Sequence, residues 1–496
     1  MKTKMEPTIH NVRVDSGNQR KIETDQANLT TAKNKFIQLY PEYETTGLLD
    51  ELRQKDYSRL DRLDHVYLDY TGAGLYAESQ IKTHLETLSG SVFGNPHSTN
   101  PSSVTTTHLV ENARAYVLDF FNASPNEYVC IFTQNASGAL KLVGESYPFG
   151  PEDQYLLTFD NHNSVNGIRE YARTRGAKVT YAPILPPEMR LDEDQLSKYL
   201  DMAQPKANNL FAYPAQSNFS GVQHSLDWIE NAHQKGWDVL LDVAAFVPTS
   251  KLDLAKIHPD FVVLSFYKMF GYPTGVGALI ARRDSLKKLH RPWFAGGTIT
   301  VASVQGDRHI LHQGSEGFED GTLNFLSLPA VEIGLKHLQK IGYERIHARV
   351  ESLTGWLLEE LSHLKHSNGS PIVKIYGPLE TDARGGTITL NFFDPANHFV
   401  DQTLVETCAN NRLISLRTGC FCNPGGGEIA LGLTKSEITT CFIKHPVMEY
   451  QDFRRCIDDK STGAVRISVG LISTFEDVFR LVEFVKEFKD KLANEI

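Results

Sequence analysis

The sequence predicts an α/β protein with a large domain, built on a mostly parallel β-sheet flanked by helices, and a smaller C-terminal α+β domain. From His65 onward, short apolar runs rich in Val, Leu and Phe alternate with amphipathic stretches of ten or more residues. This alternation favours parallel strands that are covered by helices on both faces. After residue 366 the pattern changes to short strands followed by one final helix, which indicates the second domain.

The first part of the chain is polar, and the large domain follows it. Residues 1–64 show only weak helical patterning, at 33–40 and 46–54, and we expect an N-terminal extension with one or two helices. The expected strands of the large domain are HVYLD, YVCIFT, QYLLTF, KVTYAP, NLFAYP, DVLLDV, DFVVLSF and VGALIA. The expected helices between them span residues 107–121, 164–175, 192–203 and 226–235.

The C-terminal part begins with helices and continues with strands. Residues 328–366 are typical of two successive helices with a break near Gly342. The strand-like runs that follow are IVKIYG, GTITLNF, LISLRT and AVRISVG, and residues 474–494 form the expected final helix. We therefore place the large domain at 65–340 and the small domain at 341–496.

Composition excludes several classes of function. Fifty basic against 60 acidic residues give a net charge of −10, which disfavours binding to nucleic acid. No window approaches the roughly 20 apolar residues of a membrane helix, and the first residues lack the apolar core of a secretory signal. We therefore expect a soluble, cytoplasmic protein with no nucleic-acid or membrane partner. Six cysteines are too few for a disulfide framework, so thiols or metal ligands are expected.

Polar side chains follow several of the expected strands, where ligands bind in open parallel sheets. Asn135 and Ala136 follow YVCIFT, His162 follows QYLLTF and Asn218 follows NLFAYP. A turn of small residues that opens a helix can bind a phosphate, a histidine can stack on a flat ring, and an asparagine can donate to a ring oxygen. Taken singly, each is more often a turn residue or a helix cap.

Two further strand ends carry charged residues. Asp242 ends the apolar run DVLLDV, where a buried carboxylate needs a cationic partner. Lys268 follows DFVVLSF, and a buried amine with a depressed pKa forms Schiff bases with aldehydes, although an isolated strand-end lysine reaches solvent about as often. With the other strand ends, these two form the set that pyridoxal 5′-phosphate requires, a carboxylate for the pyridine nitrogen and an amine for the aldehyde.

Cys420 and Cys422 lie in the Gly-rich loop of residues 416–427. Two thiols at this spacing could share a metal, with further ligands from Cys441, His445 or Cys456. Zinc sites usually show a second closely spaced pair, which is missing here, so the pattern disfavours a metal site. Incidental cysteines are another interpretation.

Long motifs between His65 and about Leu492 resemble the class V, fold-type I family of pyridoxal-phosphate enzymes, which includes cysteine desulfurases. Within that family, the resemblance is closest to the N-terminal desulfurase domain of molybdenum cofactor sulfurases. The motifs that carry it are YLDYTGAG, GNPHS, QNASGAL, PAQSNFSG, LLDVAAFVPT, SFYKMFGYPTGVGALIARR, EDGTLNF, RTGCFCNPGG and TGAVRISVGLIST.

This resemblance implies a role for each strand-end residue. Lys268 would form the Schiff base with the cofactor, Asp242 would pair with the pyridine nitrogen, His162 would stack on the ring, and Asn218 would contact the 3-hydroxyl. The implied phosphate contacts are Asn135, Ala136, Ser265 and, from a neighbouring subunit, Thr322. The family completes its site across a two-fold interface, so a homodimer is expected.

The resemblance also implies a reaction. Aligning RTG-x-x-C assigns the nucleophilic cysteine to Cys422, with Cys420 kept as the alternative, and Arg417 is a candidate for the positive charge that a thiolate needs. Arg466 matches the arginine that binds the substrate α-carboxylate, with a surface salt bridge as the other interpretation. The expected reaction converts L-cysteine to L-alanine and leaves a persulfide on Cys422, with Lys268 and His162 as the other catalytic residues.

Alternatives remain open at this point. The chain could be a class V aminotransferase, lyase or epimerase acting on another small amino acid, or a non-catalytic paralogue in a sulfur-transfer complex. Tyr267 stands where many desulfurases have histidine, and GGGE stands where sulfurases often have another cysteine. Because molybdenum cofactor sulfurases carry a further domain that binds the cofactor, we expect a sulfur-acceptor protein in trans.

Overall fold

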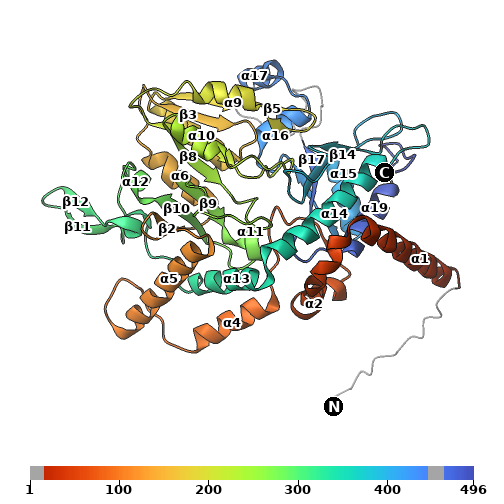
Figure 1. Cartoon of the computed structure of the whole chain (residues 1–496), viewed down its shortest axis with the longest axis horizontal. Coiled ribbons are helices and arrows are strands. Elements are labelled where there is room, and N and C mark those ends of the chain that lie inside the picture. Colours follow the sequence, from red (N-terminus) through yellow and green to blue (C-terminus); the bar gives the residue numbers. More distant parts are fainter. Residues whose placement is uncertain (1–15, 445–462, 496) are drawn as a thin grey trace, which may run out of the picture.

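The computed structural model describes residues 16–444 and 463–495, and a seven-stranded sheet forms its centre (Figure 1). The strands, in spatial order, are β2 (Tyr128–Thr133), β10 (Gly277–Arg282), β9 (Phe261–Ser265), β8 (Trp237–Asp242), β7 (Asn209–Pro214), β3 (Gln154–Thr158) and β4 (Lys178–Ala182). Strand β10 runs antiparallel to both of its neighbours, and the other adjacent pairs are parallel. The predicted mostly parallel α/β sheet is therefore confirmed.

Apart from the edge strand β4, which is mostly half-buried, the strands bury side chains on both faces, which explains the near-continuous apolar runs. In β2, Cys130 and Phe132 join one core, and Val129 and Ile131 join the other. Helices that contribute to the first core include α5 (Pro101–Phe120), α9 (Glu193–Leu200), α10 (Trp228–Gln234) and α13 (Leu328–Ile341). The helices of the second core are α6 (Ala136–Ser146), α7 (Asn163–Asn166), α8 (Ile168–Thr174) and α12 (Arg283–Leu286).

Two predicted elements of the large domain differ from the structure. The run HVYLD does not join the large sheet, because its two-residue strand β1 (Val66–Tyr67) pairs with β15 (Ile414–Ser415). The helix expected at 164–175 is two helices, α7 and α8, separated at Gly167. Seven of the expected runs thus form the sheet, and the eighth connects distant parts of the chain.

The C-terminal part is an antiparallel sheet packed on helices. Gly342, at a φ of +86°, separates α13 from α14 (Tyr343–His363), as the sequence predicts. The sheet order is β13 (Val373–Tyr376), β14 (Thr387–Phe392), β17 (Ala464–Ser468) and β16 (Arg417–Gly419). Helices α15 (Gln402–Asn411) and α19 (Phe475–Lys486) complete this part, and α19 is shorter than the expected helix at 474–494.

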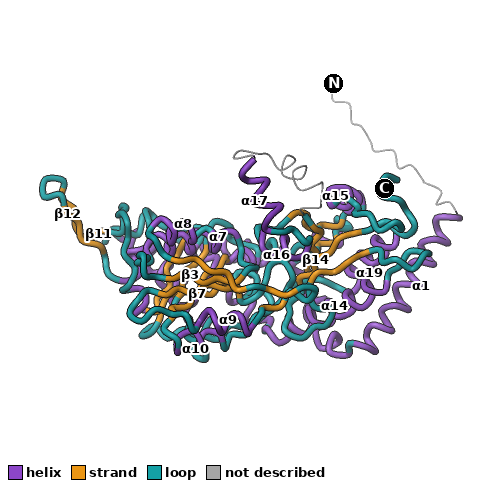
Figure 2. Tube along the Cα trace, turned by 90° about the horizontal axis from the view of Figure 1, so that it is seen from above, coloured by secondary structure: helices purple, strands orange, loops and turns teal. Residues whose placement is uncertain are grey.

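The N-terminal segment is more structured than the sequence predicts. Its elements are α1 (Ser16–Leu39), a 3-10 helix (Pro41–Thr46), α2 (Gly47–Asp56) and α3 (Arg59–Arg62). Phe36 is fully buried, and its ring stacks on Phe475 of α19 with centroids 4.6 Å apart. The fully buried Arg349 of α14 donates to Thr46 O at 2.9 Å. Figure 2 shows α1, α14 and α19 together at one end of the molecule.

Short elements connect these parts. They are α4 (Glu78–Ser89), β5 (Ile184–Leu185), β6 (Arg190–Leu191), α11 (Phe266–Phe270), β11 (Ile299–Ser303), β12 (Arg308–Leu311), a 3-10 helix (Gly314–Phe318), α16 (Pro424–Ala430) and α17 (Lys435–Lys444). The β11–β12 hairpin projects from the body of the molecule (Figures 1 and 2). Among the described residues, no helix combines the length and the apolar character needed to cross a bilayer.

Candidate active site

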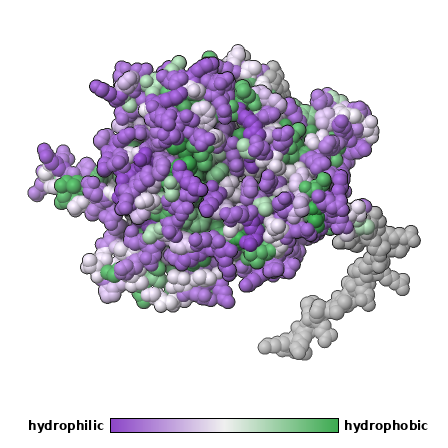
Figure 3. Space-filling view, viewed as in Figure 1, coloured by the Kyte–Doolittle hydropathy of each residue, from purple (hydrophilic) through white to green (hydrophobic). Residues whose placement is uncertain are grey.

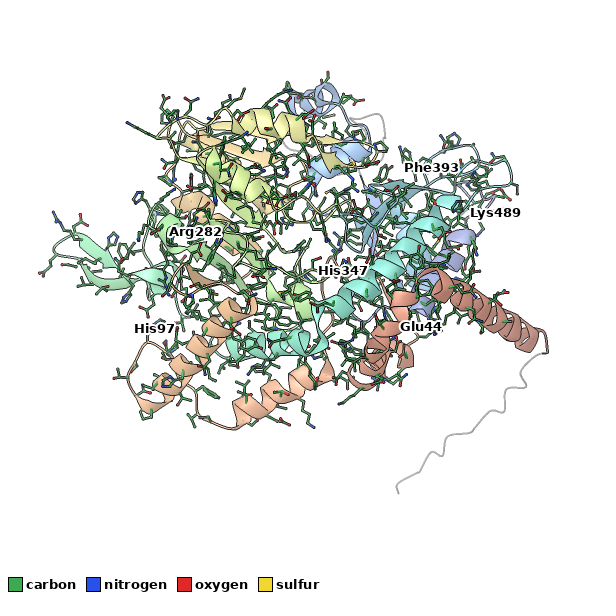
Figure 4. All side chains as sticks on the ribbon, viewed as in Figure 1. Glu44, His97, Arg282, His347, Phe393 and Lys489 are labelled. Atoms are coloured by element: carbon green, nitrogen blue, oxygen red, sulfur yellow. The ribbon has the colours of Figure 1, made fainter. Side chains whose placement is uncertain are left out.

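A cavity of about 380 Å³ lies at the carboxyl ends of the parallel strands. Strand β8 ends at Asp242, β9 ends at Ser265, and Lys268 follows in α11. Arg282 ends the antiparallel strand β10, whose first residue Gly277 pairs with Ser265, so Arg282 marks the opposite end of the sheet (Figure 4). The sequence-predicted residues that line the cavity are Asn135, Ala136, His162, Asn218, Asp242, Ser265 and Lys268.

The turn that carries Lys268 is fixed by close backbone contacts. Gly74 N–H donates to Tyr267 O at 3.1 Å, and a Cβ on Gly74 would lie 2.8 Å from Lys268 O. Gly271 ends α11 at a φ of +79°, where a side chain would overlap the backbone of Tyr76. Burial lowers the pKa of the Lys268 amine below its ordinary value, and the Asp242 carboxylate partly opposes this shift. The amine therefore becomes a neutral nucleophile at a lower pH than an exposed lysine.

Asp242 and His162 face the same cavity. Asp242 is 8% exposed, and its Oδ1 accepts from Ala244 N–H at 2.9 Å, while its Oδ2 accepts no hydrogen bond within the described chain. His162 caps α7, with Nδ1 accepting from Ser164 N–H at 3.1 Å. A neutral imidazole in this arrangement carries its proton on Nε2. Burial lowers the pKa of His162, an effect that Asp242 opposes.

The N-terminus of α6 forms a polar end of the cavity. Asn135 caps the helix, because its Oδ1 accepts from Gly138 N–H at 2.9 Å, and Ser265 Oγ accepts from Ala136 N–H at 2.8 Å. The hydroxyls of Ser137 and Ser164 lie 2.6 Å apart beside this turn. Sequence reasoning missed Ser137, although its place in QNASGAL, directly after Ala136, is a signal. A helix N-terminus with adjacent hydroxyl groups is suited to an anion such as phosphate.

Asn218 joins the cavity to the cysteine loop. Its Nδ2 donates to Phe421 O at 2.7 Å, and its Oδ1 accepts from Asn423 Nδ2 at 2.9 Å. Both ends of the side-chain amide therefore engage the loop. The contact of Asn218 with a ring hydroxyl stays a prediction.

The two loop cysteines are exposed free thiols in different surroundings. Phe421 and Cys422 have φ values of +58° and +55°, and Cys422 O accepts from Asn163 N–H at 2.7 Å. Burial lowers the pKa of Lys268, whereas a negative charge on Cys422 raises it, as the charge on Asp242 does. The Cys422 thiol therefore lies close enough to the amine to interact with it electrostatically. The β-carbon of Cys420 lies instead beside Gly427 of α16.

A buried carboxylate holds two arginines beside the loop. Arg466 is 3% exposed and donates from Nη2 to Asp69 Oδ1 and from Nη1 to Asn218 O, each at 3.0 Å. Its Nε has no partner among the described residues, and the guanidinium lies 4.8 Å from the centroid of the Phe421 ring. Arg417 donates to Asp69 Oδ2 at 2.6 Å. The alternative of a surface salt bridge at Arg466 is wrong, because this side chain is buried.

Sequence reasoning missed Asp69, although it lies in the motif YLDYTGAG. A Cβ on Gly72 would lie 2.5 Å from Asp69 Oδ2 and 2.8 Å from Arg417 Nη2. The glycine two residues before Gly74 thus makes room for the ion pair. A strand-end carboxylate followed by small residues was the available signal.

Thr322 lies outside this cavity in its own chain. It is exposed, and Asn95 Nδ2 donates to its Oγ1 at 3.4 Å. It lines a second cavity, which shares Gln134 and Gly275 with the first. Its assignment to a neighbouring subunit's site stays a prediction.

The described residues contain no cluster of three or more potential metal ligands. Cys441 is disulfide-bonded, so the expectation that the cysteines are thiols or ligands is wrong for this residue. His445 and Cys456, the other candidate ligands, lie outside the described residues.

The residues present fit pyridoxal phosphate. The cavity holds a buried amine at Lys268, a buried carboxylate with an open oxygen at Asp242, and a helix N-terminus with hydroxyl groups. These groups match the aldehyde, the pyridine nitrogen and the phosphate of the cofactor. A volume of about 380 Å³ is in the usual range of cofactor sites.

Comparison with known proteins agrees with this fit. The model of the family "Aminotransferase class-V" matches residues 66–481. The chain is 37% identical over 494 residues to a molybdenum cofactor sulfurase of Solanum lycopersicum, covering 92% of this chain and 60% of that protein. It is 36% identical to the Homo sapiens molybdenum cofactor sulfurase, covering 88% and 51%. The chain thus spans little more than half the length of these curated relatives.

Solved structures share the fold. An apo cysteine desulfurase from Thermococcus onnurineus superposes with a TM-score of 0.71 at 24% identity, covering 88% of this chain and 97% of that chain. The cysteine desulfurase CsdA from Escherichia coli gives a TM-score of 0.66 at 20% identity, covering 88% and 98%. With the family match over most of its length, this chain belongs to the class V aminotransferase family, whose cofactor is pyridoxal phosphate.

Proposed function

We propose that this protein is a cysteine desulfurase that converts L-cysteine to L-alanine and keeps the sulfur as a persulfide on Cys422. One observation carries the proposal: Lys268 and Asn218 line one cavity, and Asn218 accepts from Arg466 Nη1 at 3.0 Å and donates to Phe421 O, directly before Cys422, at 2.7 Å. An amine that moves protons, a sulfur nucleophile and a carboxylate-binding cation are the three groups that this reaction needs. The names of the curated relatives support sulfur chemistry.

Each residue has a defined task. Bound pyridoxal phosphate supplies an electron sink, with Asp242 at its ring nitrogen and the α6 N-terminus at its phosphate. Arg466 binds the α-carboxylate of cysteine, and Asp69 and Asn218 hold its guanidinium beside the loop. Lys268 accepts the Cα proton. The Cys422 thiolate then attacks the substrate sulfur, so that an S–S bond forms as the substrate C–S bond breaks, and alanine leaves after protonation at Cβ.

His162 orients the cofactor ring and supplies a proton donor. Its Nδ1 is occupied by Ser164 N–H, so its Nε2–H is the group available to the cavity. Because burial lowers its pKa, we assign it a neutral ring that packs on the cofactor and donates from Nε2.

The proposal extends to the sulfur acceptor and to the oligomeric state of the protein. By the names of the relatives, we assign the persulfide sulfur to molybdenum cofactor sulfuration, with an acceptor protein that approaches Cys422. We also propose a homodimer in which Thr322 of each chain completes the other chain's phosphate site. The β11–β12 hairpin supports a dimer, because its side chains Val301 and Ile310 are apolar and exposed. Figure 3 shows an apolar patch on this projecting hairpin. The cytoplasmic location stays a prediction.

The test measures alanine and persulfide formed from L-cysteine. We expect both products from the wild type and from Cys420→Ala, and neither from Cys422→Ala. Alanine at the wild-type rate from Cys422→Ala would contradict the assignment. A keto acid in place of alanine would instead support the class V aminotransferase alternative.

A further inference from the structure

Asn423 is a buried junction between the cysteine loop and the cofactor cavity. Its side chain is completely buried. Its Nδ2 donates to Asp160 O at 2.7 Å and to Asn218 Oδ1 at 2.9 Å, and its Oδ1 accepts from Gly426 N–H at 2.9 Å. Both donor hydrogens of the amide are therefore used, and the carbonyl oxygen caps α16.

These contacts join three separate parts of the chain. Asp160 lies two residues before His162 in the loop that follows β3, and Asn218 lies in the loop that follows β7. Both loops line the cavity, through His162 and Asn218 themselves. Asn423 directly follows Cys422, so it ties the loop cysteine to both walls of the cavity.

The backbone around Cys422 needs such support. Phe421 and Cys422 are consecutive residues with positive φ, a conformation that is unfavourable for residues other than glycine and rare for a bulky one. The neighbouring carbonyls are held from outside the loop, by Asn218 Nδ2 at Phe421 O and by Asn163 N–H at Cys422 O. Asn423 orients the Asn218 amide that forms the first of these bonds.

We propose that Asn423 is a positioning residue that holds Cys422 at the cofactor cavity by its two Nδ2 hydrogen bonds. The proposal rests on the proposed function, because it takes Cys422 as the sulfur nucleophile. The amide group is specific to this task, since aspartate has the same shape and can cap α16 but cannot donate to Asp160 O or to Asn218 Oδ1. A carboxylate would in addition repel both oxygens.

The test compares Asn423→Asp with Asn100→Asp. Asn100 caps α5 through Oδ1 to Ser103 N–H at 3.0 Å and is exposed, so it controls for the same change at another helix cap. In hydrogen exchange of both apo and cofactor-loaded protein, we expect the amides of Asn163 and Asn423 to exchange at least tenfold faster in Asn423→Asp. The β8 amides in Asn423→Asp, and the Asn163 and Asn423 amides in Asn100→Asp, should exchange at the wild-type rate.

Kinetics supply the second readout. We expect Asn423→Asp to retain cysteine binding, seen as the change in the cofactor absorption band, and to lose at least tenfold in the rate of persulfide formation. Unchanged exchange at Asn163 would overturn the proposal, and so would an equal loss of cysteine binding and persulfide formation.

If Asn423→Asp does not fold, the smaller, uncharged Asn423→Ser replaces it, and failure of both to fold would also overturn the proposal. A wild type that forms no alanine refutes the proposed function but leaves the exchange test valid.

Discussion

Arg466 Nη2 donates a 3.0 Å hydrogen bond to Asp69 Oδ1, and this pair joins distant parts of the chain beside the cysteine loop. Asp69 follows β1, and Arg466 lies in β17. Burial lowers the pKa of Arg466, and the Asp69 carboxylate opposes that shift. The Asp69 carboxylate thus favours the charged form of the guanidinium to which the proposed function assigns the substrate α-carboxylate.

Asp69→Asn should therefore destabilise the fold. Removing one partner of a buried ion pair leaves the other charge unpaired, and we expect a loss of about 3 kcal/mol in the free energy of unfolding, measured by urea denaturation. The control is Asp64→Asn. Because Asp64 forms an exposed pair with Arg480, this change should lower the free energy of unfolding by less than about 1 kcal/mol. Equal effects of the two substitutions would contradict a special role for Asp69.

Lys268 should react with the cofactor at a lower pH than an ordinary lysine. Because burial lowers its pKa, the neutral amine is present well below the usual lysine value of about 10.4. The rate at which apo protein captures pyridoxal phosphate, followed by absorbance against pH, should rise with a midpoint below that value. Lys268→Ala should capture none after borohydride reduction. A wild-type midpoint at the ordinary lysine value would show that the amine is not desolvated.

Asp242→Asn should shift the same titration further. The Asp242 carboxylate raises the pKa of Lys268 against the effect of burial, so its removal should move the capture midpoint to still lower pH. The affinity for the cofactor should fall at the same time, since the ring nitrogen loses its anionic partner. A shift to higher pH would contradict this account of the cavity.

Gly425→Ala should displace the cysteine loop. A Cβ at this position would overlap the carbonyl oxygen of Phe159, which is backbone and cannot rotate away. We expect a loss of about 1–3 kcal/mol in stability, together with a lower rate of alanine formation. Gly296→Ala is the control, because a Cβ there meets nothing within 4 Å. Wild-type activity in Gly425→Ala would show that the loop tolerates movement.

Mixed dimers can test the role of Thr322. Lys268→Ala should be inactive, and Thr322→Val should bind the cofactor weakly. In a two-fold dimer of one chain of each kind, one site has both an intact Lys268 and an intact Thr322 from its partner, so an equal mixture should regain about a quarter of wild-type activity. No gain on mixing would place Thr322 in its own chain's site or outside the site.

The order of strands and helices in the large domain could be predicted from the residues alone, because burial on both faces makes the strands continuous apolar runs. It also indicated Asp242, Lys268 and His162, since residues at the carboxyl ends of parallel strands meet at one edge. The pairing of distant side chains could not be predicted in this way and is known from the folded structure. The contacts of Asp69 with Arg466, and of Asn423 with Asp160 and Asn218, join residues more than 200 positions apart. Local periodicity carries no information about such pairs, because the packing of one part of the chain against another creates them.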